Sequence, residues 1–264
     1  MTANEYLNQV LLQYKPADLS THISTILHLK TNLVAWANTC HLGVLDSGSR
    51  AKGTAISLAS DVDYLVSLTS ACNDGAEGGS LKATYESLYE TLKTHYPNAE
   101  IRKQNVSVRI KINSLEIDIT PAKKMAGNTN YHNLYSSKTG TRKQTNIQKH
   151  INEVSQSGRT NEVKLLKIWR ELHHLDMPSI YLEFLLINEI LLNKSLASES
   201  LSDNFLFALQ ELAKDENNPL FKRVVDPANS NNILSDLLSN SEKILIISKA
   251  KLATNQKNWG SIIW

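Results

Sequence analysis

Two hydrophobic periods follow one another along this chain. After two helical stretches at the N-terminus, apolar and polar residues alternate in short runs, and from about residue 151 apolar residues recur every three or four positions. Alternation is typical of strands with one buried face, whereas the longer period is typical of amphipathic helices. The pattern therefore predicts an α+β fold, with a mixed α/β domain at 1–150 that includes the N-terminal helices and an all-helical domain at 151–264.

The first domain is expected to contain three helices and four strands. Pro16 separates the two N-terminal helices, and Pro97 ends the third, which covers 81–96. The predicted strands cover 41–45, 61–66, 106–112 and 115–119, and the last two are joined by a hairpin turn at 113–114. Two stretches rich in small polar residues, 73–80 and 123–146, are predicted as loops.

The second domain is expected to be a bundle of helices. They are predicted at 161–174, 179–192, 202–214 and 241–258. The stretch 179–192 is so apolar that it must be a core helix. An α/β part followed by a helical part predicts a two-lobed molecule with an active-site cleft between the lobes.

The composition is that of an ordinary soluble globular protein, with 41% apolar and 20% charged residues in a chain of 264. No apolar run approaches the roughly 20 residues that span a bilayer, so we expect no membrane insertion. The N-terminus lacks the basic and apolar regions of a signal peptide, and we expect a cytoplasmic protein. The two cysteines, Cys40 and Cys72, suit a reducing compartment and offer no disulfide framework.

Positive charge is concentrated in one stretch of the first domain. The net charge of the whole chain is +2, but residues 102–149 carry +8 and the remainder carries −6. A solvated basic face is one interpretation. The other is a surface for phosphates, either triphosphate tails or a nucleic-acid strand.

Three aspartates form the candidate catalytic set. Asp61 and Asp63 are two positions apart on a predicted strand and therefore project from the same face. Asp118, on the returning strand of the hairpin, can lie beside them. Such carboxylates are tolerated together when a dication neutralises them, and two Mg²⁺ or Mn²⁺ ions would suit their oxygens. Ordinary surface acids on an exposed strand are the alternative for an isolated Asp-x-Asp pair.

A small-residue turn precedes the first two aspartates. Glycine at Gly48 lets backbone N–H groups approach phosphates, and the Ser49 hydroxyl adds a donor. Together with the three aspartates, this turn predicts a site that holds a nucleoside triphosphate and two divalent metal ions.

These residues resemble the DNA polymerase β-like nucleotidyltransferase superfamily. The resemblance is carried by Gly48-Ser49, Gly53-Thr54, the run from Ser60 to Asp63, and Asp118. It implies a mixed sheet that carries three metal-binding carboxylates. It also implies nucleotidyl transfer from a triphosphate with release of pyrophosphate.

The second half of the chain narrows the resemblance. Segments 164–169, 178–183 and 226–232, with Thr145-Asn146 and His150, are similar to the oligoadenylate synthetase and cGAS-like enzymes, which include the bacterial CD-NTases of antiphage signalling. By this resemblance, Ser49, Lys167 and Ser179 would contact the triphosphate. The nucleotide-binding set that we predict consists of Gly48, Ser49, Lys52, Thr54, Lys167, Ser179 and Asn232.

Some of these residues have a simpler interpretation. Lys167 could be a solvated helix lysine, Ser179 an N-cap, and the asparagines of 229–232 turn formers. Arg142 and Lys143, in the predicted loop that follows the strand of Asp118, are expected to guide an acceptor or a growing oligonucleotide.

The predicted function is a metal-dependent, template-independent nucleotidyltransferase. It would join NMP or dNMP units from triphosphates to a hydroxyl and make a cyclic or linear oligonucleotide signal in bacterial antiphage defence. The alternative is transfer to an RNA 3′ end or to a protein hydroxyl, and a degenerate binding module is disfavoured by the three acids. The expected partners are triphosphate substrates, a nucleic-acid product or acceptor, and an effector protein.

Overall fold

The computed structural model describes residues 1–59, 61–70, 72, 81–127 and 129–264. The chain divides into two compact units. A mixed unit comprises Ala17–Ala51 and Asp61–Ile151, and a helical unit comprises Met1–Pro16, Lys52–Ser60 and Asn152–Trp264. The helical unit thus includes two N-terminal stretches that the sequence prediction assigned to the first domain. Ser60 and the predicted loop 73–80 lie outside the described residues.

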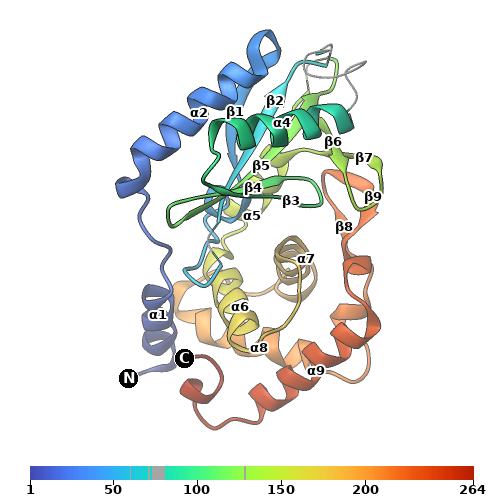
Figure 1. The fold of residues 1–264 in the computed structure, drawn as a ribbon. Helices are drawn as coiled ribbons and strands as arrows, with labels where there is room; N and C mark the ends of the chain where they lie inside the picture. The colour runs from blue at the N-terminus through green and yellow to red at the C-terminus, as the bar shows by residue number, and fades with distance from the viewer. Residues whose placement is uncertain (60, 71, 73–80, 128) are drawn as a thin grey trace. The chain divides into compact units, whose positions relative to one another are not determined.

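The mixed unit is built on a seven-stranded sheet. Its strands are β1 (His41–Ser47), β2 (Val62–Leu68), β3 (Glu100–Lys103), β4 (Val108–Ile112), β5 (Leu115–Lys124), β6 (His132–Ser136) and β7 (Thr141–Thr145). Five strands lie in the order β1-β2-β5-β4-β3, and β6 and β7 continue from the distal half of β5 (Figure 1). The pair β2 and β5 is parallel, while the other pairs are antiparallel, so the expected mixed sheet is confirmed.

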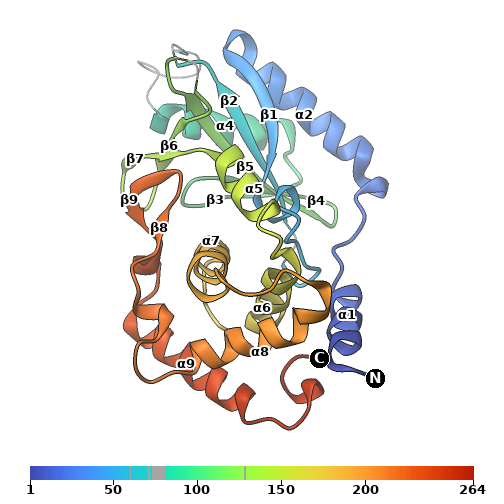
Figure 2. The same cartoon turned by 180° about the vertical axis from the view of Figure 1, so that it is seen from behind.

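Helices cover both faces of this sheet. On one face, α2 (Ile23–Ala37) and α4 (Leu81–His95) bury the main core of the unit, in which Leu33, Tyr85 and Ile117 take part. On the other face lie α3 (Gly48–Ala51) and α5 (Ile147–Ser155), and Ile147 packs on a smaller apolar cluster (Figure 2). Because both faces are covered, β2 is buried continuously from Tyr64 to Leu68 rather than at alternate positions.

The prediction of a long loop at 123–146 was wrong. The distal part of β5 reaches Lys124, and β6 and β7 form an antiparallel hairpin that pairs with it. The sequence Thr-Arg-Lys-Gln-Thr of β7 has no apolar residue, because this strand lies at the edge of the sheet and its side chains stay partly or fully exposed. Pairing with β6, which has an alternating buried pattern, therefore holds a strand that hydrophobic periodicity cannot detect.

The expectation that the cysteines stay unpaired was also wrong. Cys40 and Cys72 form a disulfide across a sequence separation of 32 residues. The bond joins the chain just before β1 to the chain beyond the end of β2. These strand ends are brought together because β1 and β2 are antiparallel, with His41 paired to Leu68.

The helical unit has its own core. It contains α1 (Ala3–Gln13), α6 (Thr160–Leu172), α7 (Ser179–Leu185), α8 (Leu201–Leu212) and α9 (Asn240–Thr254), and a π-helical turn, Leu186–Ile190, continues α7. The predicted core helix is confirmed, since every residue from Tyr181 to Leu186 is buried. The two termini lie side by side in this unit, where the hydroxyl of Tyr6 donates to the carbonyl of Ile263 at 2.9 Å (Figure 1).

A two-stranded hairpin completes the helical unit. It consists of β8 (Val225–Asp226) and β9 (Asn229–Ile233), a segment that the sequence suggested only as a turn. Within the described part of the chain, no helix has the length and apolar character needed to cross a membrane.

Candidate active site

The three predicted aspartates come together at the start of the parallel pair β2 and β5. Asp63 is directly paired with Asp118, and Asp61 immediately precedes β2. Because residues two apart in a strand share a face, all three side chains project from the face opposite the main core. The sheet thus forms a single acidic surface from segments more than 50 residues apart.

Gly48 is packed against this surface. It has a φ of 66°, and a Cβ at its position would lie 1.8 Å from Oδ2 of Asp63. Any other residue would therefore displace the carboxylate, in addition to the strain of its backbone conformation. Ser49 follows as the second residue of α3, so the predicted phosphate turn directly adjoins one of the three acids.

Arg109 binds two of the aspartates, which the sequence analysis did not foresee. Its Nε donates to Oδ1 of Asp118 at 2.7 Å, its Nη2 donates to Oδ2 of Asp118 at 2.7 Å, and Nη2 also contacts Oδ2 of Asp61. Its Nη1 donates to Glu116 at 3.0 Å. A hairpin turn centred on 113–114 places residue 109 opposite residue 118, so the predicted register already contained this pair.

Arg109 supplies a positive charge to the acidic surface. Burial raises the pKa of Asp61, and the neighbouring positive charge of Arg109 acts in the opposite direction. The hydrogen bonds to Asp118 raise the pKa of Arg109 further above its usual value. Arg109 therefore stays charged and supplies the cation that neutralises adjacent carboxylates in this structure.

The donor set suits a divalent metal ion. The described residues include no group of three acidic, histidine or cysteine side chains already arranged as ligands. However, Asp61, Asp63 and Asp118 offer carboxylate oxygens, the donors that Mg²⁺ and Mn²⁺ prefer. A positive group already lies between Asp61 and Asp118, which shows that the surface favours a cation there.

Three other predicted residues lie in a buried polar cluster of the helical unit. Glu183 of α7 accepts from Lys52 at 2.6 Å, from Lys167 of α6 at 2.6 Å and from the hydroxyl of Thr54 at 2.9 Å. Lys167 also donates to the Thr54 hydroxyl at 2.9 Å, and only 2% of it is exposed. The interpretation of Lys167 as a solvated lysine was therefore wrong.

Glu183 is the residue of this cluster that sequence reasoning missed. Its burial would raise its pKa, but the positive charges of Lys52 and Lys167 outweigh burial and lower the pKa to about 2. Burial lowers the pKa of Lys167 to about 8 despite the attraction of Glu183. The sequence did contain a signal for Glu183, because it is a carboxylate in an otherwise apolar predicted helix. It follows its partner Lys167 by 16 residues.

Ser179 and Asn232 have local partners as well. Arg170 donates to the hydroxyl of Ser179 at 3.0 Å, and the N-cap position of α7 belongs to Pro178 rather than to Ser179. Asn232 donates from its amide to Asp226 at 2.9 Å and so closes the hairpin of β8 and β9. In this structure the Asn232 amide thus stabilises the hairpin, and its predicted contact with nucleotide stays a prediction.

The two predicted acceptor-guiding residues lie on opposite faces of the sheet. Lys143 is paired with Leu134, which is paired with Ala122 of β5, and Ala122 is four residues beyond Asp118. Lys143 thus shares the face of Asp118, whereas Arg142, one residue away, projects from the other face. A predicted loop has no two faces, so the sequence alone could not separate Arg142 from Lys143.

The comparisons with known proteins assign the family. The family model described as the Second Messenger Oligonucleotide or Dinucleotide Synthetase domain (SMODS) matches residues 1–157, which is more than half of the chain. The chain belongs to the SMODS family. Among curated proteins, none matches this SMODS sequence.

Solved structures share the fold of this SMODS chain at low sequence identity. The complex of CdnC with HORMA-deltaN from E. coli MS115-1 has a TM-score of 0.71 at 19% identity, covering 96% of this chain and 89% of that one. The Bradyrhizobium diazoefficiens CD-NTase CdnG in complex with GTP has a TM-score of 0.70 at 10% identity, covering 96% and 91%. A cytoplasmic RNA terminal U-transferase reaches 0.63 at 14% identity, covering 97% and 95%.

The predicted nucleotidyltransferase fold and the CD-NTase assignment are thereby confirmed. The family is one of enzymes that synthesise oligonucleotide or dinucleotide second messengers, and such nucleotidyltransferases generally use divalent metal ions. The fold is also shared with an RNA terminal transferase, so it is the SMODS match that supports signal synthesis over RNA tailing.

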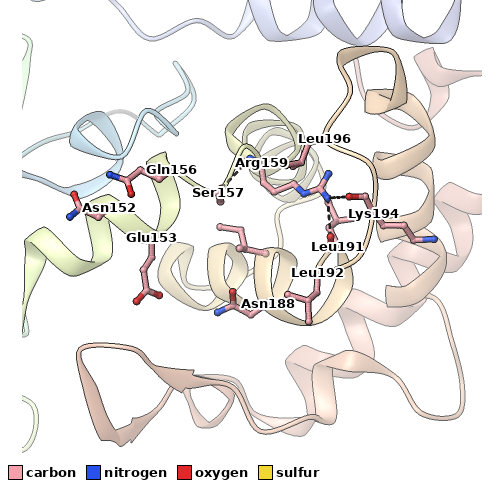
Figure 3. A pocket seen from close by; sticks show the side chains of 11 residues that line it. Asn152, Glu153, Gln156, Ser157, Arg159, Asn188, Leu191, Leu192, Lys194 and Leu196 are labelled. Carbon is pink, nitrogen blue, oxygen red and sulfur yellow. Dashed lines mark hydrogen bonds between the residues drawn. The ribbon is translucent and has the colours of Figure 1, made fainter.

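A pocket of about 440 Å³ in the helical unit of the SMODS chain was not predicted (Figure 3). Its wall combines the amide side chains of Asn152, Gln156 and Asn188 with apolar residues around the π-helical turn. Arg159 orders this wall, because its guanidinium donates to the carbonyls of Leu191 at 2.9 Å and of Ser195 at 2.6 Å. The predicted site residues do not line this pocket.

Proposed function

We propose that the acidic face of β2 and β5 is the catalytic centre at which this SMODS enzyme transfers nucleotidyl units from a triphosphate to a hydroxyl. Pyrophosphate is released, and the product is a cyclic or linear oligonucleotide signal of antiphage defence. The observation that carries the proposal is the convergence of three aspartates on one sheet face beside Gly48.

Each part of this face has a distinct task. Asp61, Asp63 and Asp118 supply carboxylate oxygens for two Mg²⁺ or Mn²⁺ ions, which when bound would activate the attacking hydroxyl and stabilise the leaving pyrophosphate. Gly48 leaves room for Asp63 and lets backbone N–H groups approach the phosphates, and Ser49 adds its hydroxyl. The aspartates would thus orient the metal ions, and the turn at Gly48 and Ser49 would orient the phosphates. Such orientation is a main contribution of the protein in phosphoryl transfer.

The predicted phosphate contacts of the helical unit follow from the family resemblance. Lys167 and Ser179 stay proposed ligands of the triphosphate, but each already has a protein partner, Glu183 and Arg170 respectively. A contact between Lys167 and phosphate requires its ammonium to exchange a bond with Glu183 or Thr54. Lys52 and Thr54 belong to the same cluster, and we propose that they support Lys167.

The test is direct. The pure protein is incubated with each labelled NTP and dNTP in the presence of Mg²⁺ or Mn²⁺, and the products are analysed by mass spectrometry with and without phosphatase. We expect phosphatase-resistant or 5′-triphosphorylated oligonucleotides together with pyrophosphate. A parallel reaction with an RNA acceptor measures tailing, and extension of that RNA in place of signal formation would contradict the proposal.

Asp63→Asn provides the matched control. It removes one carboxylate charge with little change in shape, so the protein should remain folded while transfer falls to below about one per cent, as expected when a metal ligand is lost. Circular dichroism checks the fold. Retention of substantial transfer by this variant would exclude the acidic face as the catalytic centre.

A further inference from the structure

We propose that Arg109 is a positioning residue that holds Asp61 and Asp118 while no divalent cation is bound, and that a cation must compete with its guanidinium for their oxygens. This inference rests on the proposed function, because it assigns the metal ions to the same carboxylates. Arg109 would then set the cation concentration at which the site is filled.

The contacts of Arg109 are concentrated on the candidate metal ligands. Two of its nitrogens donate to the two oxygens of Asp118, and one of these nitrogens, Nη2, also contacts Asp61. Nη2 therefore contacts one oxygen of Asp61 and one oxygen of Asp118, two of the carboxylates that would hold the cation. The side chain of Arg109 is only 17% exposed, and its position is further held by Glu116.

The local charges show why such a residue is needed. Asp61, Asp118 and Glu116 place three negative charges near one another, and Arg109 touches all three. Without a cation these carboxylates would repel one another, and the strand ends would tend to separate. The guanidinium offsets this repulsion and holds both aspartates through one side chain.

The same contacts oppose metal binding. A dication that approaches Asp61 and Asp118 meets the unit positive charge of Arg109, which already engages both oxygens of Asp118 and Oδ2 of Asp61. Removal of that charge should tighten binding by about tenfold, even if water screens the interaction strongly. A purely structural salt bridge would predict lower stability and no gain in metal affinity.

Lys111 offers a matched control on the same strand. It lies two residues from Arg109, so it shares the face, and its ammonium is 3.5 Å from Glu116. Its ion pair is thus with Glu116 and not with an aspartate of the site. Lys111→Gln therefore removes the same charge from the same neighbourhood without freeing the oxygens of Asp61 or Asp118.

The experiment measures Mn²⁺ binding without nucleotide, by the electron paramagnetic resonance signal of free Mn²⁺ at low salt. We expect Arg109→Gln to lower the Mn²⁺ dissociation constant by about tenfold and Lys111→Gln by about twofold or less. The melting temperature of metal-free Arg109→Gln should fall, and Mn²⁺ should raise it more than in the wild type. Arg109→Lys, which keeps the charge but has one nitrogen, should give an intermediate dissociation constant.

The outcomes separate this inference from the proposed function. If the wild type makes oligonucleotides but Arg109→Gln binds Mn²⁺ no more tightly than Lys111→Gln, the competition is excluded and the proposed function stands. If Asp63→Asn and the wild type bind Mn²⁺ equally and the wild type makes no product, both are excluded. If Arg109→Gln does not fold, the Mn²⁺ affinity of Arg109→Lys is the test. A dissociation constant for Arg109→Lys equal to that of the wild type would then overturn the inference.

Discussion

At the scale of single residues, two contacts with the aspartates of the acidic face differ in how clearly the sequence indicates them. Gly48 is recognisable as a turn glycine, but the reason that it must be glycine is the carboxylate of Asp63 behind it. Arg109 is one of ten basic residues in 102–149. The predicted hairpin places it opposite Asp118, but only the pairing of β2 with β5 brings Asp61 to it as well. Both residues lie against aspartates of the proposed catalytic centre.

Gly48→Ala tests the first contact. The added methyl group would overlap Asp63, and its backbone would be strained at positive φ, so we expect transfer to fall by about a hundredfold or more, which corresponds to about 2.7 kcal/mol in the barrier. Gly140→Ala is the matched control, because Gly140 has a φ of 67° but no atom within 4 Å of the place that its added methyl group would take. Initial rates of pyrophosphate release measure both variants, and equal losses would show that backbone strain alone is responsible.

At the scale of elements, the hairpin of β6 and β7 turns a basic stretch into two chemically distinct faces. Lys143 lies on the face of Asp118, about two strands away, while Arg142 lies on the face that carries Tyr135. Strand geometry places Lys143 roughly 16 Å from Asp118 on the same face, which is the reach of a few nucleotides. The basic stretch is therefore not one uniform phosphate surface.

Lys143→Ala and Arg142→Ala should consequently differ. We expect Lys143→Ala to lower product length or yield, with a defect that increases as salt screens the remaining phosphate contacts, and Arg142→Ala to behave like the wild type. Chromatography of the products at two salt concentrations measures this. Identical product profiles for all three proteins would leave the solvated basic face as the better interpretation.

At the scale of the whole molecule, the chain forms two units with separate cores and several crossings of the chain between them. The mixed unit carries the three aspartates, and the helical unit carries the buried cluster around Glu183. Both cysteines of the disulfide belong to the mixed unit, and the loop that the bond closes contains β1, β2 and the stretch Lys52–Ser60 of the helical unit.

The disulfide should add measurably to the stability of the molecule. Closing a loop with a sequence separation of 32 residues restricts the unfolded chain and is worth about 3–4 kcal/mol in the chain-entropy model. We therefore expect a reductant to lower the melting temperature of the oxidised wild type by several degrees. The double variant Cys40→Ala with Cys72→Ala should melt near the reduced wild type and should not respond to reductant; a response there would assign the effect to something else.

Most helices and inner strands were predictable because their burial is periodic along the chain. The helix 81–96 and the hairpin at 113–114 agree with α4 and with β4 and β5 to within a few residues, since an apolar stripe and a turn are local features. The edge strand β7 and the hairpin of β8 and β9 were missed because polar strands are held by their partners rather than by their own pattern.

The sequence by itself determined the family chemistry of this protein. Two aspartates at i and i+2, a third on a hairpin strand and a glycine-serine turn are local patterns, and the first two follow from strand periodicity alone. Only the tertiary structure decided that Arg109 binds Asp61 as well as Asp118, which face Arg142 and Lys143 each occupy and that the cysteines are paired. These are contacts between residues far apart in the chain, and their partners depend on strand order and register, which no local pattern specifies.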